Sequence, residues 1–395
     1  MFPTDVVIVA GARTPMSRYT GAFKDTSAIE LGAAAAREAI RRSGADPAEF
    51  DHVIFGNVMQ TSRDAIYGAR HVGLKARLKT ETPAVTVNRL CGSGLEAIIQ
   101  SAHCLLLDEA KLVLAGGMEN MTQAPHVVRG ARTGFRLGEG AMEDSLMSGL
   151  TDTFCGFSMA ETAENLAVEY KISRQACDEY ALRSQQAADA AYKACRMKEE
   201  IVPVEVKAGR KVNTVTEDDH RRADTTMEIL ASLPAAFKKD GLVTAGNASG
   251  IVDGAAAVVV TREKTARERG WKQLGRIVAW GVAGVEPRIM GIGPVPSTQK
   301  ALAAAGLKLE QMDLIEVNEA FAAQYLAVEK ALGLDREKTN VNGGAIAIGH
   351  PLGATGTRLV ITLLYELRRR GKRYGLATAC IGGGQGIAMI VESIA

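Results

Sequence analysis

Two cysteines, one histidine and one asparagine stand in the sequence where their side chains could do chemistry together. Cys91 lies in a glycine turn after an apolar strand, Asn318 and Cys380 follow apolar strands, and His350 stands in a Gly-His-Pro turn. Open α/β sheets build their sites at the carboxyl ends of strands, so we expect these four residues to converge. A thiol nucleophile, an imidazole base and a second thiol acting as acid or base are suited to moving an acyl group and a proton.

Cys91 is predicted to sit at the mouth of a helix. Residues 85–87 are typical of a buried strand, the glycines within 92–94 allow a sharp turn, and apolar residues recur at helical spacing over 95–106. Unpaired N–H groups and the helix dipole favour negative charge there, so the thiol is expected to ionise more readily than a free cysteine. The alternative is a small buried residue that only packs behind the turn.

The first third of the chain, which must position this turn, alternates predicted strands and helices. The predicted strands are 6–9, 53–57, 85–87 and 111–115, and the predicted helices are 27–42, 64–77 and 95–106. This alternation argues for a parallel sheet covered by helices.

The pattern changes between about residues 120 and 250. Strand signals are few from 129 to 149, and one long alanine-rich helix is predicted from an N-cap at Ser173 to about Ala194. We interpret this segment as an insertion, after which strands resume at 255–260.

The last third repeats the first in outline. Residues 313–318 correspond to residues 51–57, and residues 341–353 correspond to the Cys91 turn. An internal duplication makes a pseudo-two-fold molecule in which the polar strand ends of both halves meet at one place.

Composition and charge exclude several functions. The 395 residues contain 47 Lys and Arg against 45 Asp and Glu, and the net charge of +2 gives no overall field to hold nucleic acid or an anionic membrane. No stretch approaches the roughly 18 apolar residues of a membrane helix, and the short apolar run after the N-terminus does not predict a signal peptide. We therefore expect a cytoplasmic protein. The six cysteines form no CxxC pair, so neither a zinc site nor a disulfide framework is indicated.

Four motifs occur in an order that resembles the thiolases. They are 88–94 (NRLCGSG), 318–322 (NEAFA), 349–353 (GHPLG) and 380–386 (CIGGGQG), and residues 243–250 (VTAGNASG) match as well. The resemblance covers essentially the whole chain. It implies the thiolase fold, an α/β fold of two duplicated βαβαβαββ-type halves in a layered αβαβα core with an inserted loop domain.

The resemblance also implies domain limits. The N-terminal half would comprise 1–119 plus 252–272, the inserted loop domain 120–251 and the C-terminal half 273–395. The implied activity is acyltransfer, the reversible conversion of acyl-CoA and acetyl-CoA to CoA and a 3-ketoacyl-CoA.

The resemblance assigns a role to each of the four residues. Cys91 would carry the acyl group as a thioester, His350 would activate that thiol, and Cys380 would move the α-proton. Asn318 would orient a water in one oxyanion hole, with His350 beside it, and backbone N–H groups of Cys91 and Gly382 would form a second hole. Such holes answer the physical need of a Claisen condensation, because negative oxygen develops at two thioester carbonyls in turn. The family needs no metal and no covalently bound cofactor.

Coenzyme A must be bound without a Walker loop or a dinucleotide fingerprint, since the chain has neither. In the family the inserted segment covers the CoA. Arg222 could meet the nucleotide end, although a surface arginine is more often only solvated. The positions that match CoA or substrate contacts are Leu150, Met159, Arg222, Phe237, Ala245, Ser249, Ala320 and Phe321.

One departure bears on the substrate. Biosynthetic acetoacetyl-specific thiolases usually carry histidine where this chain has Ser158, and the wording of 290–296 and 324–329 is closer to degradative 3-ketoacyl-CoA thiolases of fatty-acid β-oxidation. Narrow acetoacetyl-CoA specificity is therefore in doubt. The alternatives are a decarboxylating ketoacyl synthase on the same fold and a non-catalytic acyl-CoA binding protein. Cys380 argues against the synthase, and the intact pair of Cys91 and Cys380 argues against the non-catalytic protein. The resemblance further implies a homo-oligomer, a dimer of dimers in which residues 130–140 occupy the place of the tetramerisation loop.

Overall fold

The computed structural model describes residues 4–209 and 211–394. The strands of the first half are β1 (Val6–Arg13), β2 (Ser17–Arg18), β3 (His52–Gly56), β4 (Ala84–Val87), β5 (Leu112–Glu119) and β12 (Val252–Arg262). Its helices are α1 (Ala28–Ser43), α2 (Gly68–Lys75), α3 (Ser93–Leu106) and α8 (Glu263–Glu268), with 3-10 turns η1 (Pro47–Glu49) and η2 (Ala65–Tyr67).

The second half begins at β13. Its strands are β13 (Gly275–Gly284), β14 (Leu314–Val317), β15 (Tyr374–Ile381) and β16 (Gln385–Ser393). Its helices are α9 (Pro294–Ala305), α10 (Ala322–Leu332), α11 (Ala345–Ile348) and α12 (Leu352–Arg369), with 3-10 turns η4 (Pro287–Ile292) and η5 (Leu309–Gln311).

One large sheet runs through both halves in the order β14-β15-β16-β13-β1-β12-β5-β3-β4. Only β14 with β15, β3 with β4 and β3 with β5 pair in parallel; the five pairs in the middle are antiparallel. The prediction of a parallel sheet is therefore wrong for the centre. In each half the last strand pairs antiparallel with the strand of the large sheet before it, β12 with β5 and β16 with β15. No helix separates β15 from β16, and the inserted segment, rather than a single crossover helix, separates β5 from β12.

The predicted duplication is visible in fine detail. Asp51 accepts the N–H groups of the two residues around the start of β5, and Asp313 does the same at the start of β15. The register of β1 shifts at Val9 and that of β13 at Val278, at corresponding places in their pairing with β12 and β16. β1 and β13 join the halves through only two residue pairs, so the sheet consists of two half-sheets that meet at the pseudo-two-fold axis.

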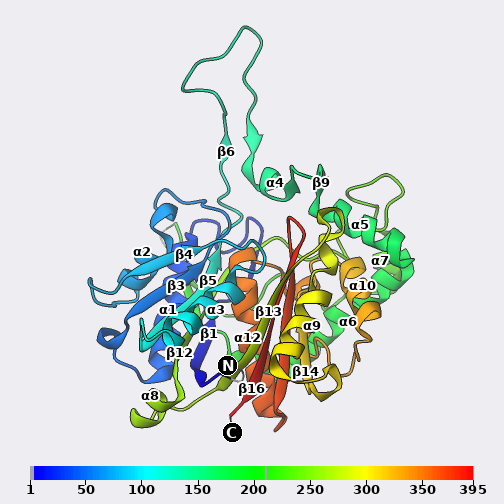
Figure 1. Ribbon diagram of the computed structural model, residues 1–395. Coiled ribbons are helices and arrows are strands. Elements are labelled where there is room, and N and C mark those ends of the chain that lie inside the picture. The colour runs from blue at the N-terminus through cyan, green and yellow to red at the C-terminus, as the bar shows by residue number, and fades with distance from the viewer. Residues whose placement is uncertain (1–3, 210, 395) are drawn as a thin grey trace.

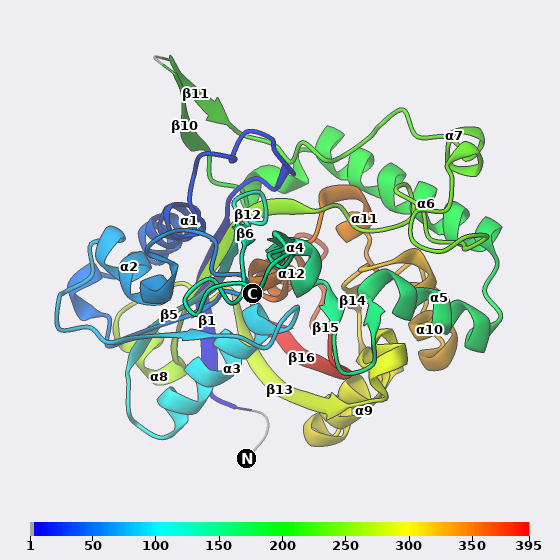
Figure 2. The same cartoon turned by 90° about the horizontal axis from the view of Figure 1, so that it is seen from above.

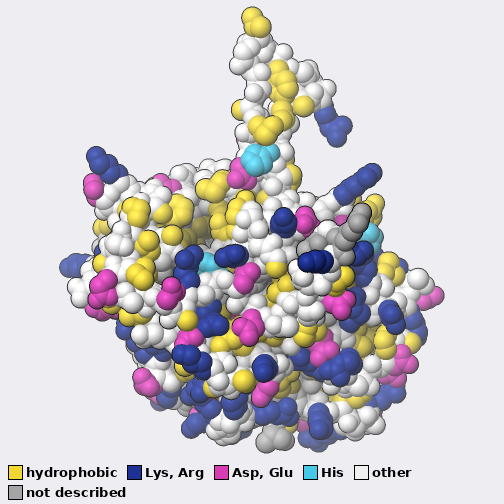
Figure 3. Space-filling view, turned by 180° about the vertical axis from the view of Figure 1, so that it is seen from behind, with side chains coloured by type: hydrophobic (Ala, Val, Ile, Leu, Met, Phe, Trp, Pro, Cys, Tyr) yellow, Lys and Arg dark blue, Asp and Glu magenta, His cyan; other side chains and the backbone are white. Residues whose placement is uncertain are grey.

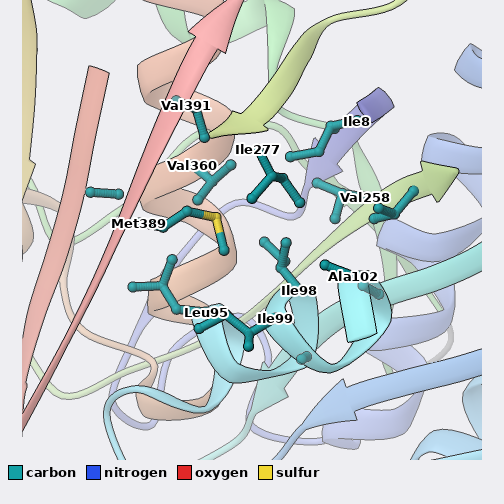
Figure 4. Close-up of a cluster of buried hydrophobic side chains, with 14 of the residues drawn as sticks. Ile8, Leu95, Ile98, Ile99, Ala102, Val258, Ile277, Val360, Met389 and Val391 are labelled. Atoms are coloured by element: carbon teal, nitrogen blue, oxygen red, sulfur yellow. The ribbon is translucent and has the colours of Figure 1, made fainter. Parts of the chain in front are cut away.

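Five layers result from the way the side chains alternate along these strands. Ala256, Val258 and Val260 of β12 face a central cluster, whereas their neighbours Ala257 and Val259 face the outer side. The central cluster holds α3 and α12 between the half-sheets (Figures 1 and 4). Helices α1 and α2 cover the outer face of the first half, and α10 packs in the cluster on the outer face of the second. The αβαβα arrangement places α3 and α12, and with them the turns that precede them, in contact.

The segment from 120 to 251 adds no strand to the large sheet in the part that the structure describes. Its short strands are β6 (His126–Val127), β7 (Glu143–Asp144), β8 (Thr151–Asp152), β9 (Phe157–Ser158), β10 (Val204–Ala208) and β11 (Lys211–Val215). Its helices are α4 (Ser145–Gly149), α5 (Met159–Tyr170), α6 (Arg174–Lys193) and α7 (Met227–Ser232), with the 3-10 turn η3 (Arg196–Glu199). The Ser173 hydroxyl caps α6 as predicted.

Two parts of this segment project from the body. The chain between β6 and β7 extends far above the sheet, and the β10–β11 hairpin extends beside α1 (Figures 1 and 2). No helix of the described residues is both long and apolar enough to cross a membrane.

Candidate active site

The turn that carries Cys91 is held by its own hydrogen bonds. Ser93 Oγ accepts the N–H of Arg89 at 2.9 Å and donates to the Leu90 carbonyl at 2.7 Å, and the Asn88 side chain accepts the N–H of Leu90 at 2.9 Å. Leu90 adopts a left-handed φ of 46°, which a leucine keeps only where its surroundings impose it. Because α3 starts at Ser93, the predicted place of Cys91 at a helix mouth is confirmed.

His350 stands two residues before α12, just as Cys91 stands two residues before α3. The two helices cross with their backbones in contact: a Cβ added at Gly94 would lie 2.6 Å from the backbone nitrogen of Thr357. The Thr357 hydroxyl also donates to the Gly94 carbonyl at 3.1 Å. The crossing fixes the two functional turns relative to each other, one from each half of the molecule.

The His350 imidazole is oriented as a neutral base. Its Nδ1 lies 2.6 Å from Thr355 Oγ1, whose hydroxyl donates to the Pro351 carbonyl at 3.0 Å, so the Nδ1–H donates to Thr355. Nε2 is then unprotonated and accepts from Asn318 Nδ2 at 3.3 Å. Burial, reinforced by the nearby Arg358 charge, lowers the pKa of His350 to about 3. The ring is uncharged at neutral pH and can take a proton at Nε2.

The expectation that Cys91 ionises readily is wrong. Burial raises the pKa of its thiol to about 11, and the charge of Glu119 adds to this rise. The backbone N–H of Gly382 acts in the opposite direction, but the desolvation cost is larger. Cys91 therefore rests as a thiol, and its proton must be removed by a base as it reacts.

Cys380 is a second protonated thiol beside the first. It is fully buried near the end of β15, and burial together with the proximity of Cys91 raises its pKa well above the usual value. This influence of Cys91 on Cys380 indicates that the fold brings the two cysteines together.

The predicted substrate contacts fall into two groups. Leu150 packs in the hydrophobic cluster around Cys91. Met159, Ala320 and Phe321 pack with Cys380 in a cluster that also contains Met290.

The 243–250 segment is fixed against the second of these groups. The N–H of Ser249 donates to the Ala320 carbonyl at 3.0 Å, and the carbonyl of Gly250 accepts the N–H of His350 at 2.9 Å. Ser249 therefore lies at the catalytic residues, as its predicted role requires.

Three predicted contacts lie farther out. Arg222, Phe237 and Ala245 are exposed on the inserted segment. The backbone N–H of Arg222 donates to Gln185 at 2.9 Å, and within the described part of the chain its guanidinium forms no ion pair. These three residues do not pack with Cys91, His350 or Cys380. Their exposed side chains are accessible to a ligand that binds on the surface of the inserted segment.

The two predicted oxyanion sites have suitable groups. Asn318 is fully buried, and its Oδ1 has no hydrogen-bond partner among the described residues. A buried amide oxygen without a partner is costly unless water or a ligand satisfies it. The N–H of Gly382 points at the Cys91 sulfur, so it lies where an oxyanion would form during attack by that sulfur.

Sequence reasoning missed three residues of this site. Thr355 could have been found, since a hydroxyl that follows a Gly-His-Pro turn by a few residues is a candidate partner for the histidine. Glu119 carried a weaker signal, a carboxylate at the end of an otherwise apolar strand. Met290, which reaches Cys380 from η4, carried none.

Comparison with known proteins agrees with this geometry. Residues 6–264 match the family described as "Thiolase, N-terminal domain" and residues 271–393 match "Thiolase, C-terminal domain". The chain is 53% identical over 391 residues to the human mitochondrial 3-ketoacyl-CoA thiolase, covering 99% of this chain and 98% of that protein. It is 47% identical over 392 residues to an acetyl-CoA acetyltransferase of Cupriavidus necator, covering 98% and 99%. The crystal structure of the human enzyme in complex with CoA superposes with a TM-score of 0.96 at 53% identity, covering 98% of both chains.

Proposed function

The chain belongs to the thiolase family, and from that premise we propose how its residues divide the reaction. The enzyme is an acyltransferase that interconverts acyl-CoA plus acetyl-CoA with CoA plus 3-ketoacyl-CoA. The observation that supports the division is the convergence of a neutral imidazole and two protonated thiols from both halves. Each carries or accepts one proton at neutral pH, which is what an exchange of acyl group and proton requires.

In thiolysis, Cys91 attacks the 3-keto carbonyl while His350 Nε2 takes the thiol proton. The N–H groups of Gly382 and Cys91 stabilise the oxyanion. Collapse breaks the carbon–carbon bond, leaving the shortened acyl group on Cys91 and acetyl-CoA as its enolate. Asn318, through a water on its free Oδ1, and His350 stabilise that enolate oxygen.

Cys380 completes the step by donating its proton to the enolate carbon. A thiol whose pKa is raised by burial is stored in the protonated form that this donation needs. An incoming CoA thiol then attacks the acyl group on Cys91 and gives its proton to Cys380, which restores that thiol. The Cys91 sulfur leaves the acyl carbon and takes back the proton held by His350. The reverse sequence is the condensation.

We propose that the substrates are 3-ketoacyl-CoAs longer than acetoacetyl-CoA. Ser158 caps α5: its hydroxyl donates to Glu161 at 2.7 Å and accepts the Glu161 N–H at 3.3 Å. It therefore serves the helix rather than a short acyl group. The 3-ketoacyl-CoA thiolase name of the human relative supports the same conclusion.

A steady-state comparison of thiolysis with acetoacetyl-CoA and 3-ketohexanoyl-CoA tests this proposal. We expect kcat/KM to be at least equal for the longer substrate. A strong preference for acetoacetyl-CoA would overturn the chain-length proposal and leave the thiolase reaction untouched.

CoA binding is proposed for the inserted segment. A relative of known structure is described in complex with CoA. Leu150 and Phe237 would flank the pantetheine, Ala245 and Ser249 would line its path, and Arg222 would meet the nucleotide end.

We further propose a dimer of dimers. The strand β4 forms the outer edge of the sheet, and its Val85 is 40% exposed; Ile66, in the turn η2 before α2, is 68% exposed. An apolar edge strand is a ready place for a second copy. The projecting loop exposes Phe135, Leu137 and Met142, and apolar side chains gather along it in Figure 3.

Light scattering at micromolar concentration tests this assembly. A tetramer is expected, and a monomer would remove the proposal. We also propose a cytoplasmic location and a role in fatty-acid β-oxidation. Cell fractionation tests the location, and growth of a deletion strain on fatty acids tests the role.

A further inference from the structure

Glu119, the last residue of β5, is a buried carboxylate with an unusual set of partners. It is fully buried, and it forms no ion pair with a cationic side chain of the described residues. Oε1 accepts from Asn57 Nδ2 and from the N–H of Met59, both at 2.9 Å. Oε2 accepts from the N–H of Val58 at 3.1 Å and of Gly353 at 2.8 Å. Four donors and no cation mean that the ionised carboxylate is held by N–H groups alone.

These donors come from both halves of the molecule. Asn57, Val58 and Met59 follow β3 in the first half, whereas Gly353 lies in the first turn of α12, just after His350. The backbones also touch here: a Cβ added at Gly117 would lie 1.8 Å from the Gly353 carbonyl oxygen. Glu119 therefore ties the His350 turn to the strand ends of the other half.

The same carboxylate lies beside the nucleophile. Its charge is among the causes that raise the pKa of Cys91. Val58 and Met59, whose N–H groups it holds, pack in the hydrophobic cluster of Cys91 together with Leu352. The carboxylate is thus placed to act on both Cys91 and His350 without reaching a substrate.

We propose that Glu119 is a positioning residue: its ionised carboxylate holds the His350 turn against the Cys91 pocket, and its charge adds to the burial that keeps Cys91 a thiol until His350 takes the proton. This inference rests on the proposed roles of Cys91 and His350. Burial raises the pKa of Glu119 above its usual value, and the backbone N–H groups of Met59, Gly353 and Val58 act against that rise. Together with Asn57 Nδ2 they place two N–H donors on each carboxylate oxygen, which favours the ionised form. Protonation of Glu119 would turn one accepting oxygen into a hydroxyl, so its N–H donors would lose their acceptor. It would also remove the negative charge that disfavours the Cys91 thiolate.

Glu119→Gln tests both effects in one variant, each with its own readout. The amide keeps one accepting oxygen, so in either orientation two of the four N–H donors lose their acceptor and the connection between the β3 end and the His350 turn is weakened. A displacement of about 1 Å in a catalytic group can cost on the order of a hundredfold, and we expect kcat to fall by roughly ten- to a hundredfold with KM for CoA little changed. The pH profile of Cys91 alkylation by iodoacetamide should shift to lower pH, because a negative charge beside the thiol is gone.

Glu164→Gln is the matched control. Glu164 is also a buried carboxylate that accepts backbone N–H groups, those of Leu242 and Val243 at 2.9 and 2.8 Å, at the start of the 243–250 segment. Its loss should raise KM for CoA and leave the alkylation profile of Cys91 in place. We therefore expect Glu119→Gln to lower kcat at nearly constant KM for CoA, and Glu164→Gln to raise KM for CoA.

Parent-like kcat in Glu119→Gln, or a fall in kcat with an unmoved alkylation profile, would overturn the proposal. If that variant does not fold, Asn57→Ala removes one of the four donors and leaves the charge; it should lower kcat several-fold at constant KM, and a parent kcat would again overturn the proposal. The proposed function fails separately, if acetyl-CoA does not acylate Cys91 in the parent enzyme.

Discussion

The two halves of the molecule share one architecture and divide the chemistry between them. The mouth of α3 carries Cys91, and the mouth of the corresponding helix α12 carries His350. β5 and β15 start at corresponding residues, so their seventh residues, Met118 and Cys380, occupy corresponding places. Neither half holds both a nucleophile and a base. The duplication supplies two sets of equivalent positions, and the reaction becomes possible only where the halves meet.

The largest expected effect tests whether the nucleophile belongs to the first half. Cys91→Ser should abolish both acylation by acetyl-CoA and turnover, because a serine hydroxyl is a much weaker acid than a thiol and His350 cannot deprotonate it effectively. Intact mass and peptide mapping measure the acyl group. Hydrogen–deuterium exchange at the acetyl methyl should persist, since Cys380 remains. An acyl group on Cys380 in the parent enzyme would reverse the two roles.

A second substitution tests the strand end of the other half. Cys380→Ser should still form the Cys91 acyl-enzyme, since that half-reaction needs no carbanion. Condensation should slow on the order of a hundredfold or more, because a positioned proton-transfer group is lost. Acyl-enzyme yield measured beside condensation rate decides it. Condensation at the parent rate would rule out the role of Cys380.

A smaller effect is expected from Thr355, the residue that orients the His350 ring. Thr355→Val removes the oxygen that accepts the Nδ1–H of His350 at nearly constant volume, so the ring loses its fixed tautomer. We expect kcat to fall about tenfold, a part of what a general base contributes. Thr355→Ser keeps the hydroxyl and should restore most of the rate. Equal rates in the valine and serine variants would contradict this orientation of the ring.

The smallest effect concerns stability rather than rate. The pKa of His350 is about 3 in the folded protein against 6.5 for a free side chain, so the unfolded chain binds more protons between these values. The free energy of unfolding should therefore fall as pH decreases from 6.5 toward 3, by at most about 1.4 kcal/mol per pH unit from this group.

Urea denaturation across this range measures the slope. His350→Asn should flatten it, and His126→Asn is the control, because His126 is exposed in the folded protein. An unchanged slope in His350→Asn would show that the ring is not held neutral.

Much of the fold followed from local signals. The helix from 28 to 43 begins at a Ser27 capping box and ends at Gly44 in the left-handed conformation, and α6 begins at the Ser173 cap. The antiparallel centre of the sheet did not follow, because alternation of strands and helices does not record which strands return directly beside their neighbours. The domain limits at 119, 252 and 273 stay predictions, although the two family matches meet between 264 and 271.

The sequence by itself determined where Cys91, Asn318, His350 and Cys380 stand relative to strands and turns, and it predicted that these four act in one reaction. It could do so because glycine turns, caps and strand ends depend on neighbouring residues. Only the tertiary structure decided the protonation states and the partners. Burial outweighs the helix mouth at Cys91, Thr355 sets the tautomer of His350, and Glu119 holds N–H groups from both halves. Desolvation and the electrostatic field depend on atoms hundreds of residues away in the chain, and no local pattern carries that information.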